Sequence, residues 1–302
     1  MFYGPPKTDI LIEFNRLARV LAETGRIQNP DKYSCYFPAF LSFAYHIQAY
    51  RIALDFCRGK RVLDIGCFSG YGENLLSSSA DEVVACDNDM EALTSAKRNY
   101  EAGNVRFLVA SAGELPFPDK SFEVVIAFQI LEHLPPDRVP AFLREIKRVI
   151  RKGGLLLLTT PNRTFRLLPF QRPFNREHYR EYSLKQLRQT LDEVYPGSRI
   201  RGIRAQKWIE ELEKERVRQA PFQVYLRSPL FGILKKMFPS GIRSRSREVL
   251  NSSRGRNETK MVSGGISQFD ACYRRFSMED FYQTEKDARR AAEFFAICEK
   301  RY

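Results

Sequence analysis

Several features that define other classes of protein are missing from this chain of 302 residues. Its six cysteines contain no Cys-x-x-Cys spacing, which argues against a disulfide framework or a zinc site. No apolar run reaches the roughly 18 residues that a membrane-spanning helix needs. The first residues also lack a basic segment followed by an apolar stretch, which is typical of a secretory signal. We therefore expect a globular, cytoplasmic protein.

The formal net charge of +13 is the one feature of the composition that could indicate a nucleic acid partner. The charge is local, because residues 199–260 hold 16 Lys and Arg against 6 Glu. That segment has few aromatic side chains on which bases could stack. We therefore do not expect the chain to bind nucleic acid.

Residues 61–72, RVLDIGCFSGYG, are the most informative stretch of the chain. The apolar run 62–65 predicts a short strand, which ends in a turn of small residues before a helix begins. Such a junction points backbone N–H groups at one spot and favours a ligand with negative or polar groups. The spelling excludes a P-loop, and the dinucleotide-binding fingerprint would need glycine in place of Phe68 and Tyr71.

Strands and helices alternate from residue 61 to residue 160, which indicates a parallel sheet with helices on both faces. The predicted strands are 61–66, 82–86, 105–109, 124–128 and 155–160, followed by 199–203 and a C-terminal strand containing FFAICEK. Asp87 follows the second strand, where a carboxylate can accept hydrogen bonds from the ribose hydroxyls of an adenosine ligand. An aspartate there can also cap the next helix, a role that Asp89 could take instead.

Together, VLDIGCFSGYG, VVACDND and LPFPDKSFEVVIAFQILEHL resemble the ordered motifs of class I S-adenosylmethionine-dependent methyltransferases. The resemblance covers residues 61–162 and is to the type that modifies quinones, glycans and other small acceptors. It implies a seven-stranded, doubly wound, Rossmann-like α/β sheet whose last strand is antiparallel. It also implies S-adenosylmethionine as cofactor and O-methylation of a small or lipid-linked acceptor such as a saccharide.

The resemblance also implies which residues form the site. The expected cofactor-binding residues are Asp64, Gly66, Cys67, Phe68, Gly70, Asp87, Asn88, Ser111, Ala112, Phe128 and Gln129. His133 and His178 are candidate catalytic bases for an acceptor hydroxyl, although either could serve only in packing. Glu177, Tyr179 and Glu181 beside His178 could orient the acceptor.

Three positions depart from the pattern of the family. Phe68 replaces the middle glycine of the first motif, which is compatible with cofactor binding if its backbone is allowed and its ring turns aside or forms a wall of the pocket. Ser111 stands where an acidic residue usually binds the adenine amino group. Relatives that act on quinones can hold a divalent ion at the positions of Glu132 and His133, but their other carboxylate is replaced by Gln129. We therefore predict no metal.

The chain is predicted to contain four segments. These are an N-terminal helical extension (1–60), the methyltransferase core (61–203), a basic insertion (204–290) and the closing strand of the core (291–302). The insertion could be a lid over the substrate, a solvated linker, or a contact with the inner face of a membrane through residues 228–247. In the extension, Tyr50 or Arg51 could line the cofactor pocket, or the aromatic side chains could only pack against the core.

Two further functions stay open at this stage. One is a catalytically inactive, cofactor-binding or scaffold protein that has kept the fold. The other is an RNA methyltransferase. The fourth strand ends in Phe128 and Gln129 and lacks the [DNS]-P-P-[FY] signature of amino-group methylation, which favours oxygen as the acceptor atom.

Overall fold

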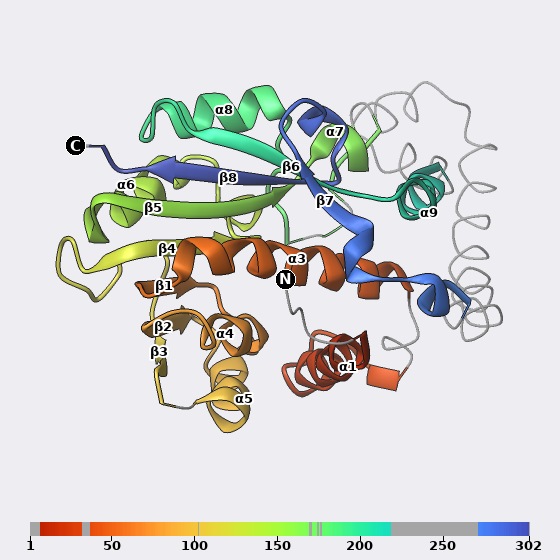
Figure 1. Cartoon of the computed structure of the whole chain (residues 1–302), viewed down its shortest axis with the longest axis horizontal. Coiled ribbons are helices and arrows are strands. Elements are labelled where there is room, and N and C mark those ends of the chain that lie inside the picture. Colours follow the sequence, from red (N-terminus) through yellow and green to blue (C-terminus); the bar gives the residue numbers. More distant parts are fainter. Residues whose placement is uncertain are drawn as a thin grey trace, which may run out of the picture.

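A computed structural model describes residues 7–31, 37–101, 103–168, 171–173, 175, 177–218 and 271–301. Within them, eight strands form one sheet in the order β3-β2-β1-β4-β5-β8-β6-β7 (Figure 1). The strands are β1 (Arg61–Ile65), β2 (Glu82–Asp87), β3 (Val105–Val109), β4 (Phe122–Phe128), β5 (Ile150–Pro161), β6 (Arg199–Ala205), β7 (Phe281–Thr284) and β8 (Glu293–Glu299). The first five are parallel, so their carboxyl ends share one edge of the sheet.

The last three strands in the sheet order, β8, β6 and β7, confirm one prediction and correct another. The strand β8 lies antiparallel between β5 and β6, as expected of the closing strand. The predicted number of seven strands is wrong, because β7 pairs antiparallel with β6 at the edge of the sheet. This short strand covers backbone groups of β6 that would otherwise form an open edge. Residues 281–284 were predicted to belong to the insertion, since four residues are too few to show a strand period.

Helices cover both faces of the sheet. The helices are α1 (Lys7–Glu23), α3 (Phe37–Cys57), α4 (Tyr71–Leu76), α5 (Met90–Tyr100), α6 (Val139–Val149), α7 (Arg163–Arg166), α8 (Leu184–Asp192) and α9 (Lys207–Arg218), with short 3-10 turns η1 (Leu131–His133), η2 (Met278–Asp280) and η3 (Ala288–Arg290). Apolar side chains of α1, α3 and α5 pack on one face, and those of α6 and α8 pack on the other. None of the helices in the described part is long and apolar enough to cross a membrane.

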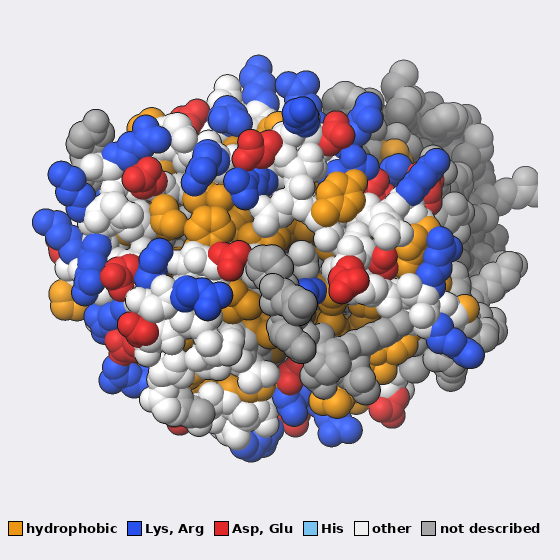
Figure 2. Space-filling view, in the orientation of Figure 1, with side chains coloured by type: hydrophobic (Ala, Val, Ile, Leu, Met, Phe, Trp, Pro, Cys, Tyr) orange, Lys and Arg blue, Asp and Glu red, His pale blue; other side chains and the backbone are white. Residues whose placement is uncertain are grey.

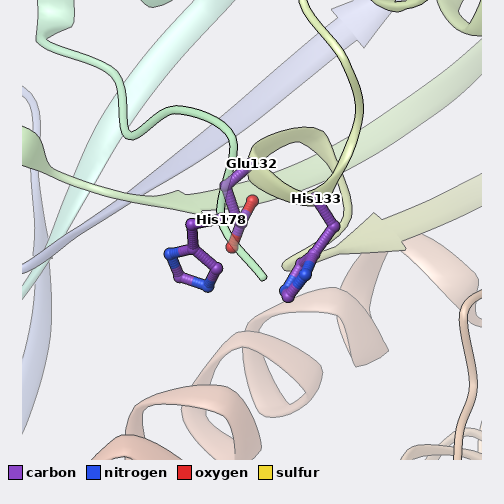
Figure 3. A group of neighbouring side chains, drawn as sticks. All are labelled: Glu132, His133 and His178. Carbon is purple, nitrogen blue, oxygen red and sulfur yellow. The ribbon is translucent and has the colours of Figure 1, made fainter. Parts of the chain in front are cut away.

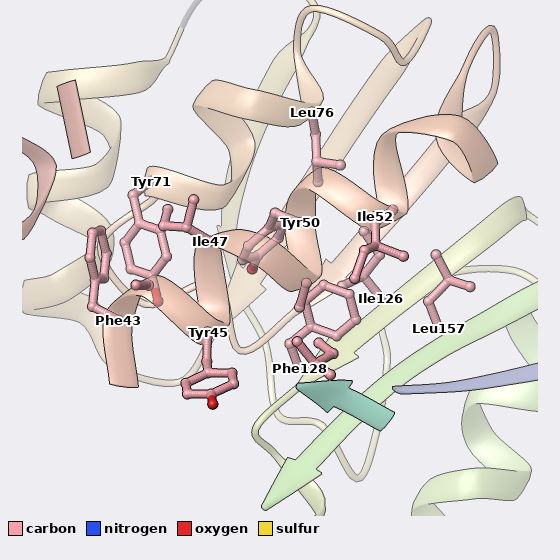
Figure 4. Packing of buried hydrophobic residues seen from close by; sticks show 14 of the residues in the cluster. Phe43, Tyr45, Ile47, Tyr50, Ile52, Tyr71, Leu76, Ile126, Phe128 and Leu157 are labelled. Carbon is pink, nitrogen blue, oxygen red and sulfur yellow. The ribbon is translucent and has the colours of Figure 1, made fainter. Parts of the chain in front are cut away.

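The helix α3 is the main contact between the N-terminal extension and the sheet. Figure 4 shows Tyr50 and Ile52 of this helix beside Ile126, Phe128 and Leu157 of β4 and β5. The ring of Tyr50 lies 5.0 Å from that of Phe128, and its side chain is only 2% exposed. The aromatic side chains therefore pack the extension onto the core, and Tyr50 lies beneath the loop that follows β1.

Charged side chains of both signs are interspersed over the described part of the face shown in Figure 2. The residues predicted to form a membrane contact, 228–247, lie outside the described residues. So does most of the basic segment 199–260 and of the predicted insertion 204–290. The lid, the membrane contact and the linker therefore stay predictions.

Gly72 provides a test of how α3 supports the loop. A Cβ atom added at Gly72 would lie 2.2 Å from Cζ of Tyr50, which is buried and cannot move aside. We expect Gly72→Ala to lower the free energy of unfolding by about 1–3 kcal/mol, because overpacking a buried site forces strained side chains. Urea denaturation measures this change. Gly113→Ala is the control, since the added Cβ would meet only Ser111 Oγ, at 3.8 Å. Equal stability of the two variants would contradict the packing described here.

Candidate functional site

The loop between β1 and α4 turns sharply, and two glycines make the turn possible. Gly66 has a φ of 78° and Gly70 a φ of 84°, in the left-handed region that favours glycine. A Cβ atom at Gly66 would lie 2.1 Å from Cδ1 of Ile130. The N–H groups of Gly66 and Cys67 donate to the carbonyl of Cys86, at 2.7 and 3.2 Å, which fixes the loop to the end of β2.

The helix after this loop is short, with six residues. It ends at Leu76, and its N-cap is Gly70, which offers no side-chain hydrogen bond. A helix of six residues carries only a small dipole. The backbone geometry of the loop is therefore a stronger feature of the site than the helix N-terminus.

Phe68 adopts an unusual backbone conformation. Its φ of 43° lies in the left-handed region, which a bulky residue rarely occupies and which glycine occupies without cost. The ring turns outward, where the guanidinium carbon of Arg26 lies 4.5 Å from its centroid. The backbone of Phe68 therefore has a conformation that favours glycine, and its ring contacts Arg26.

Asp87 joins the two loops that surround the expected adenosine site. Its Oδ2 accepts the backbone N–H of Phe68 and its Oδ1 accepts that of Asp89, both at 2.9 Å. Asp89 caps α5 through the N–H of Ala92, so Asp87 is not needed for that purpose. Each carboxylate oxygen of Asp87 keeps a lone pair, and the side chain is partly exposed. Asp87 can therefore still accept hydrogen bonds from ribose hydroxyls, with Asn88 exposed beside it.

Three of the predicted cofactor-binding side chains are buried and face the core. Asp64 is 1% exposed and accepts a hydrogen bond from the Tyr50 hydroxyl at 2.8 Å. Burial raises the pKa of Asp64 to about 7. Cys67 and Phe128 are 3% and 2% exposed. At these positions only the backbone is available to a ligand, and the side chains support the loops.

The remaining predicted residues lie at the ends of β3 and β4. Ser111 is exposed, and its Oγ accepts the N–H of Gly113 at 3.3 Å. Ala112 follows it in the same turn. Gln129 has a φ of 56°, and its amide donates to Thr159 Oγ1 at 3.2 Å. The structure thus places predicted residues from β1, β2, β3 and β4 along one edge of the sheet.

A second group of polar side chains lies next to this edge. His133 in η1 and His178 in the segment before α8 are 45 residues apart in the sequence, yet their rings form an edge-to-face contact with centroids 4.6 Å apart (Figure 3). Nδ1 of His178 lies 3.2 Å from Oε1 of Glu181. The backbone carbonyl of Glu132 accepts the N–H of Tyr179 at 2.8 Å, which attaches the second segment to the first.

Burial sets the protonation of this group. The carboxyl of Glu132 is fully buried, and burial raises its pKa to about 8, although Thr160 Oγ1 donates to it at 2.9 Å. Burial, together with the neighbouring His178, lowers the pKa of His133 to about 4. At neutral pH His133 is therefore an uncharged imidazole, and Glu132 largely keeps its proton.

These residues also have the composition of a metal site. One ligand atom each from Glu132, His133 and His178 lies within 4.8 Å of the others. Uncharged imidazoles suit a metal ion, but a buried carboxyl that holds its proton and accepts a hydrogen bond from Thr160 suits it less well. The absence of a metal stays a prediction.

Three residues of the site were not among those predicted from the sequence. Arg26 stacks on Phe68, and its Nη2 lies 3.1 Å from Asp89 Oδ2. Glu293 is 2% exposed at the start of β8, opposite Pro161 in the sheet. Arg166 in α7 has a buried Nε without a hydrogen-bond partner among the described residues. No local motif marks any of them, because each reaches the site from a different part of the chain.

Comparison with known proteins agrees with this geometry. Residues 63–158 match the family model described as a methyltransferase domain. A probable S-adenosylmethionine-dependent methyltransferase of Mycobacterium tuberculosis is 36% identical over 149 residues, which are 49% of this chain and 53% of that protein. A fatty-acid O-methyltransferase of Mycolicibacterium smegmatis is 34% identical over 119 residues, 38% of this chain and 43% of that protein. The chain spans about half the length of the first of these relatives.

A solved structure with a similar fold is the [4+2]-cyclase SpnF, with 16% identity, a TM-score of 0.47, and coverage of 85% of this chain and 81% of that chain. Residues 63–158 thus match a methyltransferase domain, and the sheet order agrees with the fold expected from the resemblance to class I S-adenosylmethionine-dependent methyltransferases. The relative from Mycobacterium tuberculosis is named for its dependence on S-adenosylmethionine.

The buried carboxyl of Glu132 leads to a prediction about pH. The pKa of Glu132 in the folded chain is about 8, above the value of about 4.3 for an exposed glutamate. Between these two pH values the folded state therefore keeps a proton on Glu132 that the unfolded state has lost. The wild type should therefore lose stability relative to Glu132→Gln as the pH rises from about 5 to about 8, by at least about 1 kcal/mol. Denaturant unfolding at several pH values measures this difference. A difference that does not change with pH would contradict the assignment.

Proposed function

We propose that this chain transfers a methyl group from S-adenosylmethionine to a hydroxyl oxygen of a small or lipid-linked acceptor such as a saccharide. The observation that carries the proposal is the pair formed by His133 and His178, which lies beside the carboxyl ends of β4 and β5. A catalytic base is useful for an alcohol, since the hydroxyl must lose its proton as the new bond forms.

The cofactor loops of the domain fit this activity. The turn at Gly66 leaves no space for a side chain, and the carboxylate of Asp87 retains lone pairs for two ribose hydroxyls. Gln129, whose amide is held by Thr159, lies at the same edge as Ser111 and Ala112. When bound, S-adenosylmethionine supplies a methyl group already activated on a sulfonium sulfur. The protein then has to align the acceptor and remove one proton.

His178 suits the role of base better than His133. The Nδ1–H of His178 can donate to Glu181, which leaves Nε2 free to accept a proton. Glu181 is therefore a positioning residue for the imidazole. His133, whose pKa burial lowers to about 4, is a weak base but can accept a hydrogen bond and orient the hydroxyl. As the carbon–oxygen bond forms and the carbon–sulfur bond breaks, the hydroxyl proton moves to His178.

The polar groups around the histidines support a hydroxylated acceptor. Glu132 Oε1, Glu181 Oε2 and Glu293 Oε2 are buried without a hydrogen-bond donor among the described residues. Buried polar atoms without partners are rare in proteins. Hydroxyl groups of an acceptor could pair with them, because a hydroxyl can accept a hydrogen bond, as the protonated Glu132 requires, and can also donate one. The fatty-acid O-methyltransferase and a 27-O-demethylrifamycin SV methyltransferase among the relatives are both named for transfer to oxygen.

The first test concerns the cofactor. Asp87→Ala should weaken binding of S-adenosylmethionine at least tenfold, because the variant loses both the ribose acceptors and the link between the two loops. Isothermal titration calorimetry measures the affinity. Asp81→Ala, at the other end of β2, is the matched control and should bind like the wild type. If the wild type does not bind at millimolar cofactor, the proposal fails, and a scaffold protein that has kept the fold becomes the better description.

The second test concerns the base. His178→Gln should lower kcat for methyl transfer at least 100-fold and leave cofactor affinity within about twofold, since a general base typically contributes 10²–10⁴-fold. Glu181→Gln should lower kcat about tenfold, because the imidazole loses its orienting carboxylate. The assay follows labelled methyl groups from S-adenosylmethionine into a panel of methyl glycosides and hydroxylated long-chain lipids. Transfer to none of these, or unchanged kcat in His178→Gln, would overturn the assignment.

An RNA methyltransferase is a less favoured alternative. It would require binding to RNA that weakens steeply with salt. A filter assay at low salt tests this directly, and RNA retention there would argue against the small acceptor.

A further inference from the structure

Arg26 connects the N-terminal extension to the cofactor loops. The helix α1 ends at Glu23, and Gly25, with a φ of 71°, lets the chain turn back so that the N–H of Arg26 donates to the carbonyl of Leu21 at 2.8 Å. This turn presents the Arg26 side chain to the core. Its guanidinium covers the ring of Phe68 at 4.5 Å and makes an ion pair with Asp89 at 3.1 Å.

The two partners of Arg26 belong to the two loops that Asp87 also joins. Asp87 accepts the backbone N–H groups of Phe68 and Asp89 from the inner side. Arg26 contacts the side chains of the same two residues from the outer side. The loop after β1 and the loop after β2 are therefore held together twice, once within the core and once by the extension.

This contact accounts for the departure of Phe68 from the glycine of the first motif. A left-handed backbone is unfavourable for a bulky residue and not for glycine. Stacking of a guanidinium on an aromatic ring contributes a stabilisation that opposes this cost. Glycine would adopt the turn without help, whereas Phe68 adopts it with Arg26 in place.

We propose that Arg26 is a positioning residue for the cofactor, which holds the Phe68 loop in the conformation that binds S-adenosylmethionine. The inference depends on the proposed cofactor binding and assigns part of that site to the N-terminal extension. If a binding-competent loop is only partly populated, the apparent affinity falls by the same fraction. The ion pair with Asp89 also offsets the charge of Arg26, so that the guanidinium does not repel the cationic sulfonium.

A double-mutant cycle tests the proposal in the full chain, with S-adenosylmethionine as the probe. Arg26→Ala should weaken binding about tenfold and speed cofactor dissociation by a similar factor. Phe68→Gly should change affinity no more than about threefold, since glycine restores the turn. In the Phe68→Gly background, Arg26→Ala should cost no more than about threefold. Calorimetry gives the affinities, and stopped-flow displacement gives the dissociation rates.

Two variants separate positioning from general stability. Arg26→Lys keeps a charge for Asp89 but loses the planar stack, so it should weaken binding about threefold. Arg98→Ala removes another contact between α1 and α5, the 3.8 Å pair with Glu23, and should not change cofactor affinity. Denaturant unfolding checks that all variants are folded.

The outcomes distinguish this proposal from the proposed function. If the wild type does not bind S-adenosylmethionine, both fail. If the wild type binds and Arg26→Ala binds equally well, or loses affinity equally in the wild-type and Phe68→Gly backgrounds, only the role of Arg26 fails. If Phe68→Gly creates binding that the wild type lacks, the loop is a relic and Arg26 has no part in cofactor binding.

Discussion

The carboxylate of Asp87 is the interaction on which the candidate cofactor site depends. It stands where β2 ends and accepts one backbone N–H from each of two loops, at Phe68 and at Asp89. A charged acceptor forms stronger hydrogen bonds than a neutral one, so Asp87 contributes more to holding the two loops together than a neutral side chain would. The parallel arrangement of β1 and β2 brings both loops to the same edge, and Asp87 then fixes them there.

The side chain of Tyr50, which packs under the loop after β1, is a second constraint on that loop. The hydroxyl of Tyr50 donates to Asp64, and the ring of Tyr50 leaves no space for a side chain at Gly72. Asp64 and Glu73 are both buried, and burial raises the pKa of Asp64 to about 7 and that of Glu73 well above its usual range. Buried carboxyls of this kind cost stability unless they hold a proton or a hydrogen bond. The layer under the loop is therefore polar, and the N-terminal extension supplies part of its hydrogen bonding through Tyr50.

The fold could be predicted where the signal is local, and much of the site could not. The alternation of apolar strands with helices predicted the parallel strands, and local signals of the same kind include Ser183, which caps α8 and forms a capping box with Gln186. The loops after the strands were therefore placed on the correct edge. By contrast, the left-handed backbone of Phe68 depends on Arg26, and the contact of His133 with His178 depends on how a 45-residue connection folds. Contacts between residues this far apart in the sequence produce no periodic pattern in it, so sequence analysis does not predict them.

The burial of several predicted site residues changes what each of them can do. Asp64, Cys67 and Phe128 carry the motifs of the family, yet their side chains face the core, so their place in those motifs reflects support of the loops. Buried oxygens without a partner among the described residues lie both under the loop, on Asp64 and Glu73, and near the histidines, on Glu132 and Glu181. An acceptor with several hydroxyl groups could pair with the oxygens near the histidines, since a hydroxyl both donates and accepts hydrogen bonds. In the proposed function, one side of this edge binds the adenosyl group, the other side binds the acceptor hydroxyl, and the methyl group passes between them.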